Sequence, residues 1–233
     1  MFKKIPPNIL HDIHILNEYT AKSGKESTLT GCSRTGVDKV FTAGAGGGDD
    51  GSVESLSCDP RFGDTNRVMD HHTHPHDPSA VGLLPSQADL AVTLSESKIH
   101  NRKQISCISN AQAPLIACQQ SKRVPSQQKV NEYIAHEIDS GDFYKSEFHR
   151  KNIPKDFNFA YFDPATGQRV QASDEQILDT MFGAATPVLR EETSKPEKDR
   201  LCKYVKSVSG AKKSIINKCE ETLTKPSVSD NIG

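Results

Sequence analysis

The sequence predicts an α/β domain in which helices and a sheet pack in layers. Two observations favour this fold class. Residues 8–20 carry apolar side chains at intervals of three and four, as one face of a helix does, namely Ile9, Ile13, Leu16 and Tyr19. Short runs rich in apolar and β-branched residues follow, interrupted by a second helical pattern, and this alternation is typical of a layered domain.

The first expected strands lie around a glycine-rich stretch. Three runs have the length and composition of a strand: "ESTLTGCS" (26–33), "VDKVFTA" (37–43) and "NRVMDHH" (66–72). We expect "GAGGGDDG" (44–51) to form a flexible loop between the last two. Because no Gly-Lys-Ser/Thr follows these glycines, the loop does not have the pattern of a phosphate-binding loop.

A second helix is expected over residues 85–97, where a proline and a serine N-cap precede a helical pattern. Two more strands follow at 103–110 ("KQISCISN") and 114–120 ("PLIACQQ"). The order of these elements predicts one layered domain over residues 1–124.

The sequence pattern changes after residue 124. We expect residues 125–233 to form a mixed, mainly helical region whose role the sequence leaves open. The patterns indicate a helix at 129–138, a hairpin at 157–171 and another helix at 174–182.

Composition narrows the function classes. The chain has 233 residues, of which 34% are hydrophobic and 25% charged, and its net charge is -1. This charge gives no reason to expect nucleic acid or an anionic membrane as a partner. No apolar run approaches the ~20 residues that span a bilayer, and the N-terminal residues are a poor signal peptide. We therefore expect a cytoplasmic protein.

The six cysteines show no metal-type spacing. Cys107 and Cys118 lie inside apolar, strand-like runs, where we expect reduced and buried thiols. Disulfides are compatible with the even number, but nothing in the pattern requires them. The cysteines therefore favour a reducing compartment.

The stretch "DHHTHPHDPSAVGLLPSQADL" (70–90) holds four histidines within six positions. His72 and His74 are two residues apart, so on an extended backbone their side chains point to the same side. Two imidazoles from one strand end and a carboxylate from the next helix, Asp89, are a donor set typical of hydrolytic zinc. The alternative is a helix N-terminus in which Ser86 is the cap and Asp89 interacts with the helix dipole.

A hydrolytic metal site also needs a carboxylate that can take a proton from water. Glu26 begins the strand after the first helix, and a neighbouring strand could bring it beside the histidines. Glu54 is the second candidate for this general base, but it adjoins the glycine-rich loop and not a junction between helix and strand.

"HTHP" followed by "SQAD" resembles the JAMM (MPN-plus) motif of zinc metalloproteases, E … H-(S/T)-H-P … S-x-x-D. The resemblance implies that His72, His74 and Asp89 are zinc ligands and that Glu26 is the general base. It also implies that Ser86 helps to stabilise the oxyanion.

This resemblance covers roughly residues 1–124. It implies a central mixed sheet flanked by helices, with the C-terminal region as a mainly helical extension. The implied activity is hydrolysis of a peptide or isopeptide bond in a protein or peptide substrate, including removal of a ubiquitin-like protein or processing of a precursor. Two features depart from the family: the loop between Pro75 and Ser86 is longer, and Gly31 lies later after Glu26 than the family's glycine.

Two alternatives stay open. Asp70, His72 and His74 also form D-x-H-x-H, which resembles the first metal motif of PHP-type phosphoesterases and amidohydrolases, enzymes built as barrels with two or three ions. The chain could also be a non-catalytic interaction module on the MPN-like fold. The sequence does not specify the substrate or the oligomeric state.

The remaining histidines of this stretch have other expected roles. His71 should point to the face opposite His72, and we expect it to be structural. His76 and Asp77 are expected to be polar loop residues, with a second ion as the alternative.

Overall fold

The computed structural model describes residues 3–34, 40–48, 58, 65–75, 85–110, 115–139 and 147–170. In chain order the helices and strands are α1 (Pro7–Ser23), β1 (Ser27–Arg34), β2 (Val40–Gly47), β3 (Thr65–Thr73), α2 (Gln87–Ile99), β4 (Ile105–Ser109), β5 (Ile116–Ser121), α3 (Gln127–Asp139), α4 (Glu147–Asp156) and β6 (Phe157–Phe162). The expected class is confirmed as a mixed α/β fold with a sheet flanked by helices.

Six strands form one sheet in the order β2-β1-β3-β4-β5-β6. β3 and β4 are parallel, and the other neighbouring pairs are antiparallel. Since parallel strands need a crossover connection, α2 joins β3 to β4. In such a unit the N-terminus of the helix lies near the carboxyl end of the preceding strand. This topology brings residues 86–89 close to the end of β3.

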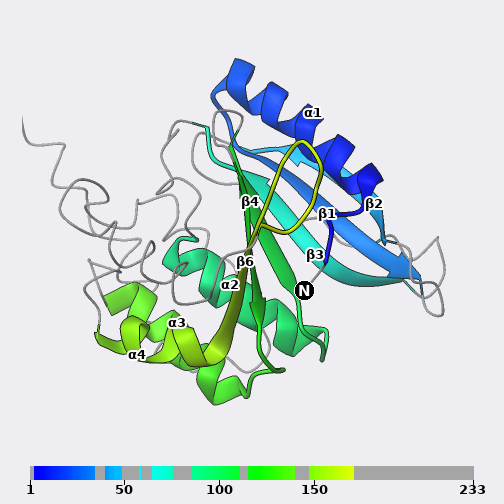
Figure 1. The fold of residues 1–233 in the computed structure, drawn as a ribbon. Coiled ribbons are helices and arrows are strands. Elements are labelled where there is room, and N and C mark those ends of the chain that lie inside the picture. Colours follow the sequence, from blue (N-terminus) through cyan, green and yellow to red (C-terminus); the bar gives the residue numbers. More distant parts are fainter. Residues whose placement is uncertain are drawn as a thin grey trace, which may run out of the picture.

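The sheet separates two layers of helices (Figure 1). α1 packs over β1, β2 and β3, whereas α2 lies on the other face, against β4 and β5, and also contacts α3. α1 ends at Gly24, whose φ of 72° is in the left-handed region that glycine adopts without a steric penalty. The chain then turns directly into β1.

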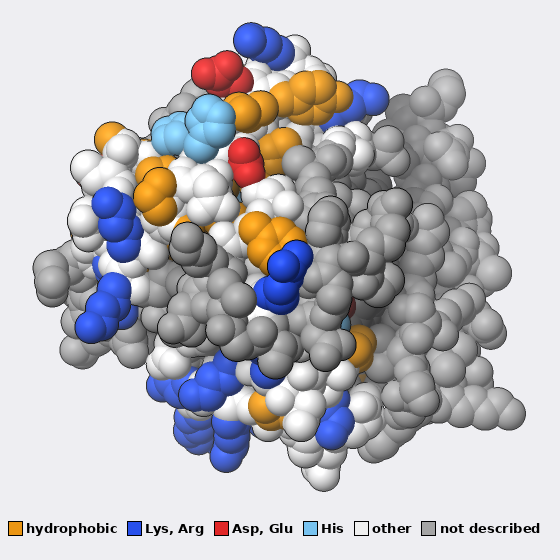
Figure 2. Space-filling view, turned by 90° about the vertical axis from the view of Figure 1, so that its right-hand side faces the viewer, with side chains coloured by type: hydrophobic (Ala, Val, Ile, Leu, Met, Phe, Trp, Pro, Cys, Tyr) orange, Lys and Arg blue, Asp and Glu red, His pale blue; other side chains and the backbone are white. Residues whose placement is uncertain are grey.

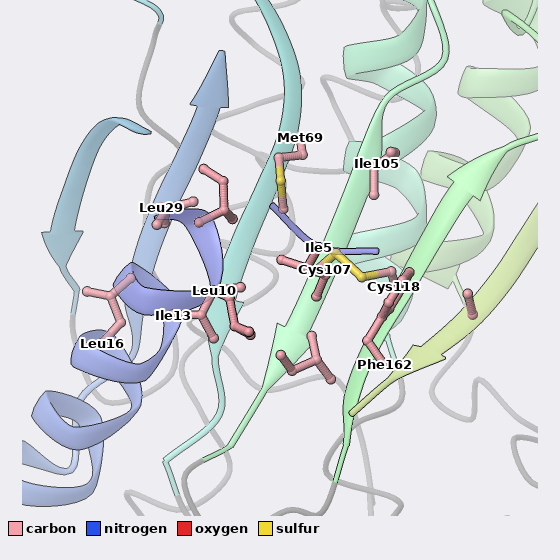
Figure 3. Packing of buried hydrophobic residues seen from close by; sticks show 13 residues of the cluster. Ile5, Leu10, Ile13, Leu16, Leu29, Met69, Ile105, Cys107, Cys118 and Phe162 are labelled. Atoms are coloured by element: carbon pink, nitrogen blue, oxygen red, sulfur yellow. A yellow bond between two sulfur atoms is a disulfide. The ribbon is translucent and has the colours of Figure 1, made fainter. Parts of the chain in front are cut away.

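The layer under α1 is an apolar core (Figure 3). It is formed by residues of α1, the segment before it, and all strands from β1 to β6 except the edge strand β2: Ile5, Ile9, Leu10, Ile13, Leu16, Leu29, Met69, Ile105, Cys107, Ile116, Cys118, Ala160 and Phe162. The helical spacing predicted from residues 8–20 therefore marks the buried side of α1, except that Tyr19 is exposed. Burial of these side chains provides the main driving force for packing α1 on the sheet.

The expectation of reduced thiols at Cys107 and Cys118 is wrong, and a second pair of cysteines is also joined. Cys107 and Cys118 lie directly opposite each other on β4 and β5 and form a disulfide, and Cys32 is joined to Cys58. The strand pattern was visible in the sequence, but the register that places two cysteines face to face was not. Because disulfides persist in oxidising environments, these pairs remove the basis for expecting a reducing compartment.

Two boundaries differ from the expectation. β2 continues through Gly44–Gly47, which were expected to begin a flexible loop. The sheet also continues past residue 124, where the first domain was expected to end, because β6 pairs with β5 from Ile116↔Phe162 to Ser121↔Phe157. A strand whose partner is far along the chain is not marked by any local pattern as belonging to the same sheet.

In residues 125–170 the helix expected at 129–138 lies within α3, and a turn after β6 leads to a bridge between Phe162 and Arg169. The helix expected at 174–182 and the rest of the C-terminal extension lie outside the described residues. Among the helices that the structure describes, none combines the length and the apolar character needed to cross a bilayer.

Candidate metal centre

The end of β3 carries the histidine pair on the face toward α2. His72 is the next-to-last residue of β3, and His74 follows the strand, its N–H donating to the Ser109 carbonyl at 2.9 Å. Both imidazoles are buried, and their Nε2 atoms are 3.2 Å apart. The expected same-side arrangement of the H-x-H pair is therefore present.

Asp89 reaches the pair from the first turn of α2. One carboxylate oxygen, Oδ1, lies 3.5 Å from Nε2 of His72. The other, Oδ2, accepts a hydrogen bond from the Ser86 N–H at 2.7 Å, while Ser86 Oγ accepts one from the Asp89 N–H at 3.2 Å. This is a capping box. Asp89 can therefore be both a capping residue and a metal ligand, because Oδ2 takes part in the capping box while Oδ1 faces His72.

His72, His74 and Asp89 form a buried group that could bind a metal ion. One ligand atom from each residue lies within 4.8 Å of the others. In a tetrahedral zinc site with ligand bonds of ~2.0–2.1 Å, neighbouring ligand atoms are about 3.3 Å apart. The distances from His72 Nε2 to His74 Nε2 and to Asp89 Oδ1, 3.2 and 3.5 Å, are close to that value. The group could therefore bind a metal ion, and the two distances from His72 are compatible with tetrahedral coordination.

The alternate residues of β3 face α1 and hold the strand in place. His71 lies 2.7 Å from Ser109 Oγ, which in turn donates to Asn17 Oδ1 of α1 at 2.7 Å. Burial, together with the neighbouring His72 and His74, lowers the pKa of His71 to about 3. His71 is thus a neutral, buried residue on the face opposite His72, as expected.

An ion-pair cluster lies before the histidines on β3. Arg67 contacts Asp70 at 3.4 Å and Glu96 of α2 at 3.0 Å, and all three side chains are largely buried. Burial raises the pKa of Asp70, against the opposing effects of Arg67 and His72. Asp70 therefore interacts with a guanidinium group and is not part of the three-residue metal group.

Glu26 is buried and immediately precedes β1, the strand that pairs with β3. The antiparallel register pairs Thr28 with His72, and continuing it by two residues places Glu26 across from His74. Residues across from each other in antiparallel strands share a face of the sheet. The Gly48 N–H, directly after β2, donates to the Glu26 carbonyl at 2.8 Å. This bond holds the main chain of Glu26 on the side away from β3.

Some expected residues cannot be placed. Glu54, His76 and Asp77 lie outside the described residues. Two features of the site were not expected from the sequence: the contact of Arg67 with Asp70, and the position of the Thr73 side chain behind the two histidines. Strand alternation could have indicated that Thr73 faces α1. No local pattern could have indicated Arg67, because a register shift in the pairing of β1 with β3 occurs next to it.

Comparison of the chain with protein-family models and with curated proteins finds no match.

Proposed function

We propose that the chain is a zinc-dependent hydrolase of a peptide or isopeptide bond. The observation that carries this proposal is the buried group of His72, His74 and Asp89, whose ligand atoms lie within 4.8 Å of one another, with the two distances from His72 Nε2 close to those of a tetrahedral zinc site. The position of Glu26 on the neighbouring strand supports it, because a hydrolase of this type needs a carboxylate on the same face.

Each residue would have a distinct role. His72, His74 and Asp89 hold the cation, which when bound lowers the pKa of a water molecule and polarises the scissile carbonyl. Glu26 takes the proton from the attacking water and gives it to the leaving amine. Ser86 uses one lone pair of Oγ in the helix cap, so its hydroxyl hydrogen can donate to the oxygen that develops negative charge.

The proposed substrate is a protein or peptide, including a ubiquitin-like conjugate. Support for this class comes from the resemblance of "HTHP … SQAD" to the JAMM motif, together with Glu26 at the start of a strand that follows the first helix.

The alternative PHP-type hydrolase is less well supported. Enzymes of that class are barrels with parallel strands, whereas the described strands form a sheet with edges at β2 and β6 and a single parallel pair. Asp70, which would be a ligand in that class, is paired with Arg67.

Metal content tests the proposal most directly. We expect one zinc per chain in purified protein by elemental analysis, and none after combined His72→Ala and His74→Ala substitution. Two or three ions per chain would favour the PHP-type alternative, and zinc retained in the variant would contradict the site.

Substitution of the proposed base separates an enzyme from a non-catalytic module. Glu26→Gln should retain zinc but lose hydrolysis of lysine-linked conjugates of ubiquitin-like proteins or of linear peptides, by about 100-fold or more. Glu18→Gln, an exposed glutamate on α1, is the matched control and should retain activity. Unchanged hydrolysis in the Glu26 variant would show that Glu26 is not the base, and no hydrolysis by the wild type would favour the module.

A further inference from the structure

Three buried hydroxyl groups form a cluster directly behind the metal group, on the face toward α1. They belong to Thr20 of α1, Ser27 of β1 and Thr73 of β3, and each residue is at most 2% exposed. The Oγ1 atoms of Thr20 and Thr73 are 2.6 Å apart, and Thr20 Oγ1 is 3.0 Å from Ser27 Oγ. The hydroxyl cluster therefore joins three elements at one point.

Within this cluster, Thr73 binds the main chain of the strand that follows Glu26. Its Oγ1 accepts a hydrogen bond from the Ser27 N–H at 2.8 Å and donates a longer one, of 3.4 Å, to the Ser27 carbonyl. The regular pairing of β1 with β3 has its last pair at Thr28↔His72. Beyond that pair, the Thr73 side chain binds the main chain at the start of β1.

Thr73 and Ser27 are each adjacent in the chain to residues of the proposed site. Thr73 lies between His72 and His74, and Ser27 directly follows Glu26. The Thr73 side chain thus connects the segment that carries the two histidines to the segment that carries Glu26. The Thr73 side chain faces α1, whereas its neighbours on the strand point toward α2. It therefore lies on the face of the sheet opposite the proposed ligands and the proposed base.

We propose that Thr73 is a positioning residue that holds Glu26 at its working distance from the histidine pair. This inference rests on the proposed function. Misplacing a reacting group by about 1 Å costs on the order of 100-fold in rate. A general base is sensitive to such a shift, because it must lie within hydrogen-bond reach of the proton it takes.

The histidine pair has its own attachments. The N–H of His74 donates to Ser109, and β3 pairs with β4 from Met69 to Thr73. Removing the Thr73 hydroxyl should therefore move the start of β1 and leave the metal ligands in place. Proton transfer and metal binding are expected to respond differently to this single change.

The test compares Thr73→Val, which keeps the size but lacks the hydroxyl, with Thr73→Ser, which keeps the hydroxyl. Ser97→Ala is the matched control, because Ser97 is a buried hydroxyl near the far end of α2 that bonds to Ser121 and to the Gln104 N–H. Thr73→Ala replaces the valine variant in the same comparison should the latter not fold. Each protein is loaded with Co²⁺ as the probe, and its visible absorption spectrum, which reports the surroundings of the ion, is compared with that of Glu26→Gln.

We expect Thr73→Val to bind Co²⁺ within about tenfold of the wild-type affinity, because the Thr73 hydroxyl bonds to Thr20 and Ser27, whereas a loss of about 10- to 100-fold is typical of groups that bond to a metal ligand. Its spectrum should change in the same sense as that of Glu26→Gln, and the double variant should match Glu26→Gln alone. Thr73→Ser should restore the wild-type spectrum. With a substrate that the wild type cleaves, kcat of Thr73→Val should fall about 100-fold while KM changes little.

Two results would overturn the inference: a wild-type spectrum and kcat in folded Thr73→Val, or an equal change in Ser97→Ala. In either case Co²⁺ binding and the effect of Glu26→Gln would remain, so the proposed function would stand. If the wild type bound no Co²⁺, the proposed function would fail, and the role of Thr73 would fail with it.

Discussion

The two faces of the sheet differ in chemistry although they share the same strands. Under α1 the side chains are mainly apolar, with Ile13 and Leu29 among those fully buried. Between α2 and the strands lie hydroxyl, amide and charged groups, including Gln119 donating to Thr93 at 3.3 Å and Ser97 at 2.8 Å from Ser121. An apolar face gains stability by excluding water, whereas a buried polar face must satisfy each group with a partner.

β3 shows how one strand serves both faces. Met69, His71 and Thr73 face α1, and the residues between them face α2. The strand thus contributes to the core with one set of side chains and, with the other, places His72 in the candidate metal group. We therefore expect the largest stability effects from the apolar layer under α1, whereas the candidate metal group lies on the α2 face.

The largest effect on stability is expected from the apolar face. Ile13→Ala should reduce the free energy of unfolding by about 2–5 kcal/mol, because the lost apolar contacts leave a cavity in a closely packed layer. Urea denaturation measures this change. Zinc affinity of the folded variant should remain near the wild-type value.

Ile15 provides the matched control on the same helix. Its side chain is 53% exposed. Figure 2 shows histidine and hydrophobic side chains next to each other on the upper part of one face of the molecule. Ile15→Ala should change the free energy of unfolding by no more than about 0.5 kcal/mol. Equal losses in the two variants would break the distinction between the buried and exposed sides of α1.

A smaller effect concerns α4, which contacts β6, and it depends on pH. Burial lowers the pKa of His149 from 6.5 to about 4, with a further contribution from His136. Between these pH values the unfolded chain binds a proton that the folded chain does not, so stability decreases as the pH falls from about 6.5 to about 4. The contribution of this residue is up to about 3 kcal/mol.

Replacement of His149 by Gln should weaken the pH dependence of the denaturation midpoint over this range. His11→Gln is the control, because His11 is exposed on α1. A pH dependence that persists in full after the His149 substitution would assign it to other groups, of which His71 is the first candidate.

The smallest expected effect separates a helix cap from a catalytic group. Ser86→Ala should reduce stability by about 1 kcal/mol through loss of the cap on α2. Ser126→Ala is matched, because Ser126 Oγ accepts from the Lys129 N–H at 3.2 Å at the start of α3. The two variants should be similarly destabilised, but the Ser86 variant alone should lose hydrolytic rate. Similar rates in both would show that Ser86 is a cap without a catalytic role.

Much of the fold could be predicted, because its signals are local. The apolar period of α1, the serine cap of α2 and the short apolar runs of β4 and β5 each come from residues that are neighbours in the chain. The three residues expected as ligands were recognised for the same reason: two lie on one strand end, and the third begins the helix that follows.

The pairings between distant segments were not predictable in this way. The continuation of the sheet into β6, the disulfide between Cys107 and Cys118, and the contact of Arg67 with Glu96 all depend on which strands meet and in what register. A shift of a single residue in register moves a side chain to the other face of the sheet. Local patterns carry no information on that choice.

The sequence by itself indicated most of the elements of the first 124 residues and the residue types of the candidate metal group, because periodicity, capping and ligand type are properties of short segments. Only the tertiary structure decided that β1 pairs with β3 up to Thr28↔His72 and that the Thr73 side chain bonds to Ser27, the residue after Glu26. Those relations arise from long-range pairing, in which packing of the whole sheet selects one register among many.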